Sequence, residues 1–205
     1  MEKRCYIVGA GEFCECELPQ QGDYVIAADG GYTVLAKLGI EPDMLVGDFD
    51  SLEEIPNHPN IKESPVEKDD TDMMLAVKEG LKLGYNLFII NGGLGGRLDH
   101  TLANIQTLVY LANNNARGVL IGRSEQITVI KNNEITIDSD IRKGRLLSIF
   151  CAGDKAEGVT LKGLKYPLNN ATLTNALPMG CSNEFTDQPA TISVTNGTLI
   201  IIAGV

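Results

Sequence analysis

The chain has 205 residues, with 17 Lys or Arg and 27 Asp or Glu, so its formal net charge is −10. With 43% hydrophobic and 21% charged residues, it has the composition of a globular protein with one large or two small domains. Its acidity argues against nucleic acid as a partner, and no apolar run reaches the roughly 18–20 residues of a membrane span. Because the start also does not resemble a signal peptide, we expect a cytoplasmic protein without a membrane partner.

In the first part of the chain, the hydrophobic pattern alternates between the period of a strand and that of a helix. Short apolar runs predict strands at Cys5–Val8, Tyr24–Ala28, Met44–Val46, Leu87–Ile90 and Val119–Ile121. Helical spacing and terminal glycines predict helices at Tyr32–Leu38, Thr71–Leu83 and Thr101–Ala112. This alternation predicts an α/β domain with a mainly parallel sheet over residues 1–123.

After Arg123 the segments become short and rich in Thr and Ile, and turn residues separate them. Strands are predicted at Ile127–Ile130, Ile135–Ile137, Leu146–Ala152, Val159–Leu161, Thr191–Thr195 and Thr198–Ala203. Asn196-Gly197, between the last two, is typical of a two-residue hairpin turn. We therefore expect residues 124–205 to form an all-β, sandwich-like domain without a strong helix.

The five cysteines are odd in number and scattered, which favours reduced thiols. Cys14 and Cys16 lack the spacing of zinc ligands, and the chain has only two histidines, so a zinc site is not expected. Gly9-Ala10-Gly11 resembles the start of a dinucleotide fingerprint, but Cys14 stands where the third glycine would be. This segment is therefore either a phosphate-binding turn or a plain turn at the end of a strand.

The negative charge is concentrated in residues 41–72, which contain eleven Asp or Glu and two Lys. Asp48 and Asp50 follow a predicted strand, at the edge where open α/β sheets bind ligands. Two neighbouring carboxylates repel each other unless a cation lies between them, and an oxygen-only set favours Mg²⁺. The alternative is a solvated turn, in which aspartate is common.

Two further segments join this edge. Lys68-Asp69-Asp70-Thr71-Asp72 opens a predicted helix, where acids can act as ligands or simply stabilise the helix start. Asn91–His100 has four glycines after a strand, then Arg97, which can bind a phosphate through two hydrogen bonds, and Asp99 just before a helix. This indicates phosphate chemistry without a P-loop, whose GxxxxGK[ST] pattern is absent. A flexible, capped turn is the alternative.

Taken in order, these motifs resemble those of the thiamine pyrophosphokinase family. The motifs are Ala28-Asp29-Gly30-Gly31, Gly47-Asp48-Phe49-Asp50-Ser51, Lys68-Asp69-Asp70-Thr71-Asp72, Gly95-Gly96-Arg97-Leu98-Asp99-His100 and Cys181-Ser182-Asn183-Glu184-Phe185. Each motif is weak alone, but the ordered set is specific and extends over nearly the whole chain. The resemblance implies an α/β catalytic domain followed by a β-sandwich that binds thiamine, in a homodimer with the active site between subunits.

The resemblance also implies roles for individual residues. Magnesium would be held by Asp48, Asp50 and Asp72. ATP would be bound by Asp29, Gly30, Gly31, Lys68, Gly95, Gly96 and Arg97. Thiamine would be bound by Asp72, Asp99, Ser182 and Asn183. The family often places a large aromatic side chain near the thiamine ring, but this chain has no Trp, which leaves Tyr166, Phe185 or Met179.

The implied reaction transfers the diphosphoryl group of ATP to the hydroxyl of thiamine and gives thiamine diphosphate and AMP. Asp48, Asp50, Asp72, Arg97 and Asp99 are the expected catalytic residues, with either Asp72 or Asp99 as the base. Two alternatives stay open. Asp48-Phe49-Asp50-Ser51 also resembles the motif of haloacid-dehalogenase phosphatases, although Leu52 departs from it. A nucleotide- or thiamine-binding sensor without catalysis is the other.

Overall fold

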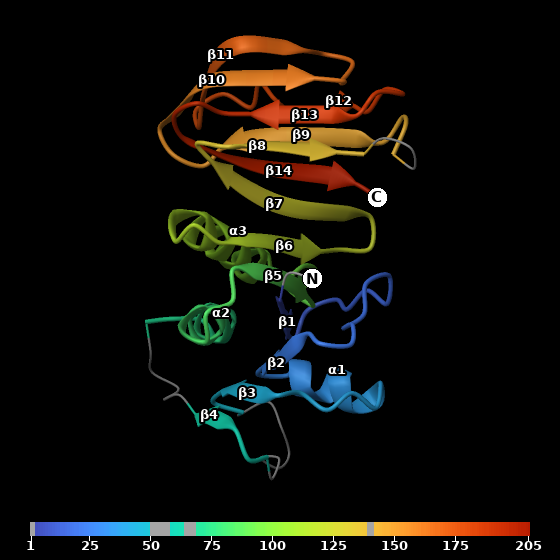
Figure 1. Cartoon of the computed structure of the whole chain (residues 1–205), viewed down its shortest axis with the longest axis vertical. Helices are drawn as coiled ribbons and strands as arrows, with labels where there is room; N and C mark the ends of the chain where they lie inside the picture. The colour runs from blue at the N-terminus through green and yellow to red at the C-terminus, as the bar shows by residue number, and fades with distance from the viewer. Residues whose placement is uncertain (1–2, 50–57, 64–68, 139–141) are drawn as a thin grey trace. The chain divides into compact units, whose positions relative to one another are not determined.

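The computed structural model describes residues 3–49, 58–63, 69–138 and 142–205. The chain forms two compact units, Met1–Arg123 and Ser124–Val205 (Figure 1). No helix in the described ranges is long and apolar enough to cross a membrane. Asp50 and Lys68, both predicted site residues, lie outside these ranges.

The first unit is a parallel sheet with helices. Its elements are β1 (Arg4–Val8), β2 (Tyr24–Ala28), α1 (Gly31–Lys37), β3 (Met44–Gly47), β4 (Ile61–Glu63), α2 (Asp72–Lys82), β5 (Leu87–Asn91), α3 (Leu98–Asn113) and β6 (Arg117–Ile121). The strand order is β6-β5-β1-β2-β3-β4, and every pair is parallel. The three helices and five of the six strands match the predicted elements. The sixth, β4, has only three residues, too few to show a hydrophobic period.

Helices cover both faces of this sheet. On one face, Tyr6, Val8 and Ile89 pack in a core that includes Leu35 of α1. On the other, α2 approaches so closely that a Cβ on Gly80 would lie 2.6 Å from the Phe88 ring. Figure 1 shows α1 and α2 on opposite sides of the strands. Central strands are therefore apolar without alternation, as is usual in parallel sheets.

The strand order places a topological switch point at the ends of β1 and β5. From β1 the chain moves outward through β2, β3 and β4, and then returns through α2 to β5 on the other side of β1. The loops after β1 and β5 therefore leave the sheet in opposite directions and leave a crevice between them. Open α/β sheets bind ligands at such a switch point.

The second unit contains only strands among its described elements. They are β7 (Glu125–Lys131), β8 (Glu134–Ile137), β9 (Leu146–Cys151), β10 (Lys155–Lys162), β11 (Leu168–Thr174), β12 (Asn183–Glu184), β13 (Ala190–Ser193) and β14 (Thr198–Gly204). They form two antiparallel layers, β12-β9-β14-β7 and β11-β10-β13-β8, around one hydrophobic core. Strands such as β14 alternate between buried and half-buried residues, as strands covered on one face do. The change from a parallel sheet with helices to antiparallel strands agrees in part with the predicted fold class, since the strands are ordered in one ten-stranded mixed sheet and one four-stranded antiparallel sheet.

The predicted hairpin at Asn196-Gly197 is wrong. β13 pairs with β8 and β10, whereas β14 pairs with β7 and β9, so the turn connects two different layers. The N–H of Gly197 donates to Oδ1 of Asn132 (2.8 Å), and the N–H of Asn196 donates to the carbonyl of Glu157 (3.1 Å). These contacts with distant segments hold the turn in place of a two-residue hairpin bond.

Candidate active site

A cavity of about 360 Å³ lies at the carboxyl ends of the first unit's strands. It is lined by Gly9, Ala10, Gly11, Ala28, Asp29, Thr71, Asp72, Met73, Gly92, Gly93, Gly95, Gly96, Arg97, His100 and Asn104. These residues come from the ends of β1, β2 and β5 and from the starts of α2 and α3. The cavity thus occupies the switch point and gathers Asp29, Asp72, Gly95, Gly96 and Arg97 from the predicted site.

Two helix starts border the cavity, which favours a negatively charged ligand there. Thr71 caps α2 through its hydroxyl oxygen, which accepts from the N–H of Met74 (3.2 Å). α3 begins at Leu98, three residues before the predicted Thr101, so Asp99 lies in its first turn. The N–H groups of a first helical turn carry partial positive charge and bind anions well.

The glycines around the cavity have two different roles. The N–H of Gly9 donates to the carbonyl of Asn91 (2.9 Å), and that of Gly11 donates to the carbonyl of Gly92 (2.8 Å). These glycines allow two loops to touch, because a Cβ on Gly92 would lie 2.4 Å from the carbonyl oxygen of Gly9. Gly95 and Gly96 are exposed, and their N–H groups have no partner among the described residues. They are therefore the better placed to meet a phosphate.

Arg97 and Asp99 form an exposed ion pair at the start of α3. Nη2 of Arg97 donates to Oδ2 of Asp99 (2.7 Å), and Nε donates to Oδ1 (3.2 Å). The hydrogen bond from Arg97 lowers the pKa of Asp99, and the N–H of His100 acts in the same direction. The same pairing raises the pKa of Arg97. While the pair persists, Asp99 is a weak proton acceptor.

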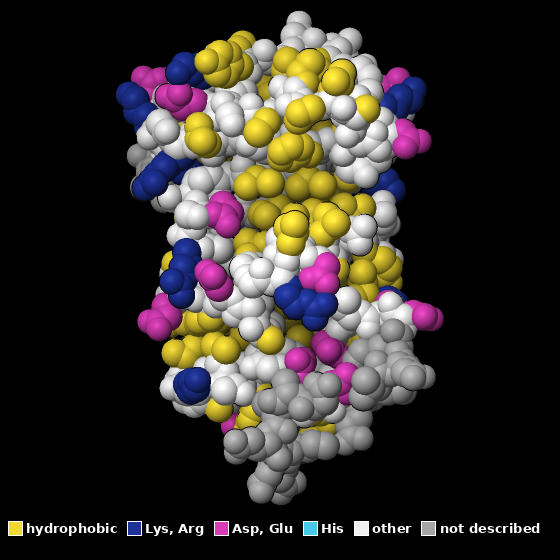
Figure 2. Space-filling view, turned by 180° about the vertical axis from the view of Figure 1, so that it is seen from behind, with side chains coloured by type: hydrophobic (Ala, Val, Ile, Leu, Met, Phe, Trp, Pro, Cys, Tyr) yellow, Lys and Arg dark blue, Asp and Glu magenta, His cyan; other side chains and the backbone are white. Residues whose placement is uncertain are grey.

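Of the predicted metal ligands, Asp48 follows β3 and Asp72 opens α2, while Asp29, predicted to face ATP, lies beside the end of β3. The N–H of Asp29 donates to the carbonyl of Val46 (2.8 Å), and a Cβ on Gly47 would lie 3.2 Å from Cα of Asp29. Asp48 follows Gly47 but does not line the cavity, whereas Asp72 does. Figure 2 shows acidic side chains gathered in one area of this unit's surface. Within the described ranges, which lack Asp50, no three acidic, His or Cys side chains are arranged to hold a metal.

Other predicted residues have structural explanations. Asp70 accepts a 2.6 Å hydrogen bond from Lys78, whose ammonium also lies over the Tyr110 ring. Gly31 is buried, and a Cβ there would lie 2.0 Å from the carbonyl oxygen of Val8. Packing of α1 on β1 therefore requires this glycine, independently of its predicted role in binding ATP. Gly30 precedes α1 as its N-cap and does not line the cavity.

The predicted thiamine residues of the second unit differ from each other. Ser182 is exposed, whereas Asn183 is 5% exposed. Oδ1 of Asn183 accepts from the N–H of Tyr166 (2.9 Å), and its Nδ2 donates to the Tyr166 carbonyl (2.7 Å). Tyr166 itself is 60% exposed, while Phe185 is 2% exposed and part of the core. Of the three candidates for contact with the thiamine ring, Tyr166 and Met179 are accessible and Phe185 is not.

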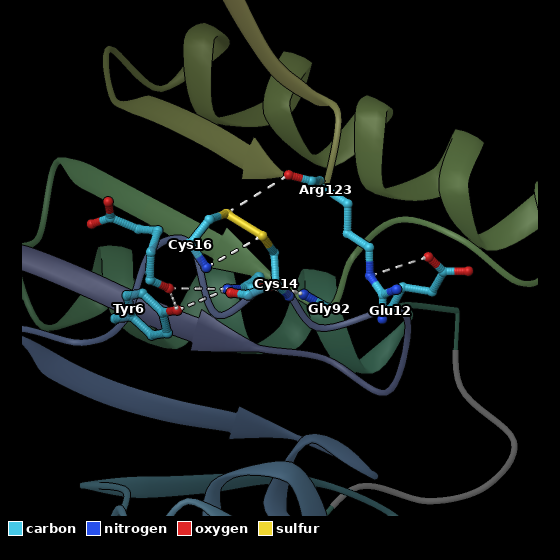
Figure 3. Close-up of a disulfide and its surroundings, with 9 residues drawn as sticks. Tyr6, Glu12, Cys14, Cys16, Gly92 and Arg123 are labelled. Atoms are coloured by element: carbon cyan, nitrogen blue, oxygen red, sulfur yellow. Dashed lines mark hydrogen bonds and ion pairs between the residues drawn. A yellow bond between two sulfur atoms is a disulfide. The ribbon is translucent and has the colours of Figure 1, made fainter. Parts of the chain in front are cut away.

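The loop after β1 contains a feature that the sequence analysis predicted wrongly. Cys14 and Cys16, expected to be reduced, are joined by a disulfide, while Cys5, Cys151 and Cys181 are free (Figure 3). Two cysteines separated by one residue close a very small ring, which spacing rules for longer loops do not anticipate.

Sequence reasoning left Gly9–Gly11 open between a phosphate-binding turn and a plain turn, and these residues line the cavity. It gave no role to two asparagines. Asn104, on a face of α3 that also carries Leu108 and Leu111, donates to the carbonyl of Gly93 (2.7 Å). Asn91 at the end of β5 is fully buried. An amide at an otherwise apolar helix or strand position was the available signal for both asparagines.

Comparisons with known proteins agree with the resemblance seen in the motifs. A family model described as the thiamin pyrophosphokinase catalytic domain matches residues 16–120, and one described as the vitamin B1 binding domain matches residues 132–199. Thiamine pyrophosphokinase of Bacillus subtilis is 35% identical over 183 residues, which is 86% of this chain and 85% of the relative.

Solved structures give the same result. The crystal structure of thiamine pyrophosphokinase from Bacillus subtilis has a TM-score of 0.86 and 30% identity, and covers 98% of both chains. That from Geobacillus thermodenitrificans has a TM-score of 0.81 and 27% identity, and covers 98% of this chain and 97% of the other. The chain therefore belongs to the thiamine pyrophosphokinase family.

Proposed function

We propose that the chain transfers the diphosphoryl group of ATP to thiamine. The primary hydroxyl oxygen of thiamine forms a bond to the β-phosphorus, and the bond between that phosphorus and the oxygen bridging to the α-phosphorus breaks. AMP leaves with the bridging oxygen, and the hydroxyl proton passes to a base. Family membership supports this reaction, and it favours a kinase over the phosphatase or sensor alternatives.

One observation carries the proposal in structural terms: the cavity combines groups for phosphate with carboxylates. Arg97, the N–H groups of Gly95 and Gly96, and two helix starts suit a polyphosphate. Asp29 and Asp72, which line the same cavity, suit cationic partners, and thiamine is itself a cation. Preorganised donors of this kind stabilise charge that develops during phosphoryl transfer.

The carboxylates in and beside the cavity fit a magnesium ion by their donor chemistry. Asp48 and Asp72, with Asp50 predicted from sequence, offer only carboxylate oxygens, the ligands that Mg²⁺ prefers. When bound, Mg²⁺ would neutralise phosphate charge and so allow ATP to approach an acidic wall. Asp29 lies beside the chain that leads to Asp48, and we assign it to ATP binding.

Asp72 is the better candidate for the base that accepts the hydroxyl proton. Asp99 is held by Arg97, which lowers the pKa of that carboxyl and disfavours protonation. Asp72 lines the cavity at the first residue of α2. We therefore assign proton acceptance to Asp72, and to Asp99 a role in holding Arg97 and contacting thiamine.

On the thiamine side, we infer that Tyr166 takes the place of the missing Trp. Its ring is exposed, and the Lys165 ammonium lies 5.8 Å from the ring centre, a position that the thiazolium of thiamine would take by displacing the ammonium. Asn183 would act indirectly, through its hydrogen bonds to the Tyr166 backbone. We place this surface against the first unit of a partner subunit, in a homodimer with two shared sites.

The metal and proton roles are tested by Asp72→Asn. We expect activity to fall about 100- to 10,000-fold, because the amide can neither accept the proton nor bind the cation as a carboxylate does. Asp70→Asn is the matched control, because Asp70 lies two residues away but pairs with Lys78. Activity and thermal unfolding are measured for both variants. A folded Asp72→Asn protein with full activity would refute the assignment.

A further inference from the structure

Asn91, the last residue of β5, is a buried amide whose hydrogen-bonding groups are all engaged. Its Oδ1 accepts from the N–H of Cys14 and from the N–H of Gly92, both at 2.9 Å. Its Nδ2 donates to the hydroxyl of Tyr6 (3.0 Å) and to the carbonyls of Cys14 (2.7 Å) and Glu17 (3.1 Å). The side chain is fully buried, so no water competes for these bonds.

The partners of Asn91 belong to the two loops that form the crevice. Cys14 and Glu17 lie in the loop after β1, whose Gly9–Gly11 part lines the cavity, and Gly92 begins the loop after β5. Tyr6 completes the connection, because its hydroxyl donates to the carbonyl of Glu17 (2.6 Å). Burial raises the pKa of Tyr6 to about 12, so this hydroxyl keeps its proton at neutral pH. Figure 3 shows Tyr6, Cys14 and Gly92 grouped around this network.

The backbone of the two loops depends on the same contact. The pairs Gly9–Asn91 and Gly11–Gly92 join the loops directly, as does the N–H of Glu12 with the carbonyl of Leu94 (2.8 Å). Gly95, whose N–H faces no protein partner in the described chain, follows Leu94 immediately. A shift of the loop after β1 would therefore move the backbone that leads to Gly95 and Arg97.

We propose that Asn91, together with Tyr6, is a positioning residue for nucleotide binding, which sets the distance between the two loops that receive the polyphosphate. The proposal rests on the assignment of the cavity to ATP. Asn91 does not line the cavity, so its effect passes through the backbone of Gly92 and of the loop after β1. It should therefore change ATP affinity more than thiamine affinity.

The first unit contains a second hydrogen-bonded Asn–Tyr pair, half-buried rather than buried, that serves as a control. Nδ2 of Asn60 donates to the hydroxyl of Tyr24 (3.1 Å) and to the carbonyl of Asp43 (2.9 Å), and neither Asn60 nor Tyr24 lines the cavity. Tyr6→Phe and Tyr24→Phe each delete one hydroxyl that accepts from an asparagine amide. Comparison of the two variants shows whether an effect on ATP binding comes from the loss of any such hydrogen bond or specifically from the loss of the bond between Tyr6 and Asn91.

The test measures the KM values for ATP and thiamine, the Kd for ATP by calorimetry in magnesium buffer, and thermal unfolding. For Tyr6→Phe we expect the KM and Kd for ATP to rise about threefold to tenfold, with kcat and thiamine KM within about twofold of the parent. Asn91→Asp should raise the KM and Kd for ATP further, because it replaces the amide donor with a carboxylate oxygen that faces two carbonyl oxygens. Tyr24→Phe should leave the ATP values unchanged even if its unfolding temperature falls.

The outcomes separate this proposal from the proposed function. Unchanged ATP values in Tyr6→Phe, or equal effects in Tyr6→Phe and Tyr24→Phe, would overturn the positioning role even if the parent protein is fully active. If the parent makes no thiamine diphosphate but Tyr6→Phe still weakens ATP binding, the function is wrong and the positioning role stands. Should Asn91→Asp fail to fold, Tyr6→Phe decides the question alone.

Discussion

Arg97 and Asp99 point toward each other at the start of α3, and this pairing decides what each can do. In the structure described, the guanidinium is occupied by the carboxylate, so an arriving phosphate must compete with Asp99 for Arg97. Exposed pairs of this kind contribute little to stability, so replacing Asp99 by a phosphate as the partner of Arg97 costs little free energy. The pair therefore holds Arg97 near the cavity and still lets a phosphate replace Asp99 as its partner.

Replacement of Arg97 by Lys tests the two-bond contact with phosphate. We expect Arg97→Lys to lower kcat/KM for ATP about tenfold to a hundredfold, because an ammonium keeps the charge but loses the planar pair of donors. Arg123→Lys is the control, since both side chains are 72% exposed and Arg123 lies outside the cavity lining. Steady-state kinetics at saturating thiamine give the result. Equal activities of the two variants would contradict the role of Arg97.

Sequence reasoning placed several of the predicted residues at one edge of the sheet, and the structure brings these to the cavity. Asp29, Asp72 and Arg97 could be named because they follow strands or open helices, and topology brings such positions to one edge. The role of Asn183 could not be judged, because a motif does not reveal that a side chain is buried against the Tyr166 backbone. A motif shows which positions matter, whereas the burial of a side chain shows whether it can contact a ligand or only holds the backbone in place.

At the scale of the elements, the apolar runs of the first unit predicted the strands well because each is buried on both faces. Helix limits were less accurate, since Leu98 and Asp99 are exposed and add nothing to the hydrophobic period that marks α3. The error at Asn196-Gly197 has another cause. The same dipeptide suits several turns, and distant partners, Asn132 and Glu157, decide which one forms.

The close packing of α1 on β1 leads to a prediction for Gly31. Because a Cβ at this residue would lie 2.0 Å from the Val8 carbonyl oxygen, we expect Gly31→Ala to reduce the free energy of unfolding by about 3 kcal/mol. Gly153→Ala is the control, since nothing lies within 4 Å of a Cβ there. Chemical denaturation measures both. If Gly31→Ala is as stable as the control, the packing explanation for this glycine is wrong.

At the scale of the whole molecule, the surplus of negative charge has two parts. Asp48 and Asp72 belong to the proposed site, and Asp70 pairs with Lys78 instead. Glu79 also lies outside the site, where it contacts Lys62 and Lys82. A count of charges therefore includes acids that pair with lysines outside the proposed site.

The proposed homodimer predicts complementation between two defective variants. Asp72→Asn impairs the cavity of the first unit, and Tyr166→Ala impairs the thiamine surface of the second. If each site combines one unit from each subunit, a mixed dimer keeps one intact site. Random mixing should then restore about a quarter of the parent activity when thiamine is kept below the KM of Tyr166→Ala.

The mixture is refolded or coexpressed with two tags, and activity is compared with the sum of the separate variants. Activity equal to that sum would show that the sites are not shared. Activity of a mixture of Asp72→Asn with itself serves as the background.

The most direct test of the central claim is to identify the nucleotide product. The purified protein is incubated with ATP, thiamine and Mg²⁺, and the products are separated and quantified. Transfer of the whole diphosphoryl group requires one AMP for each thiamine diphosphate formed, with no thiamine monophosphate intermediate. Formation of ADP in step with a thiamine phosphate would contradict the account.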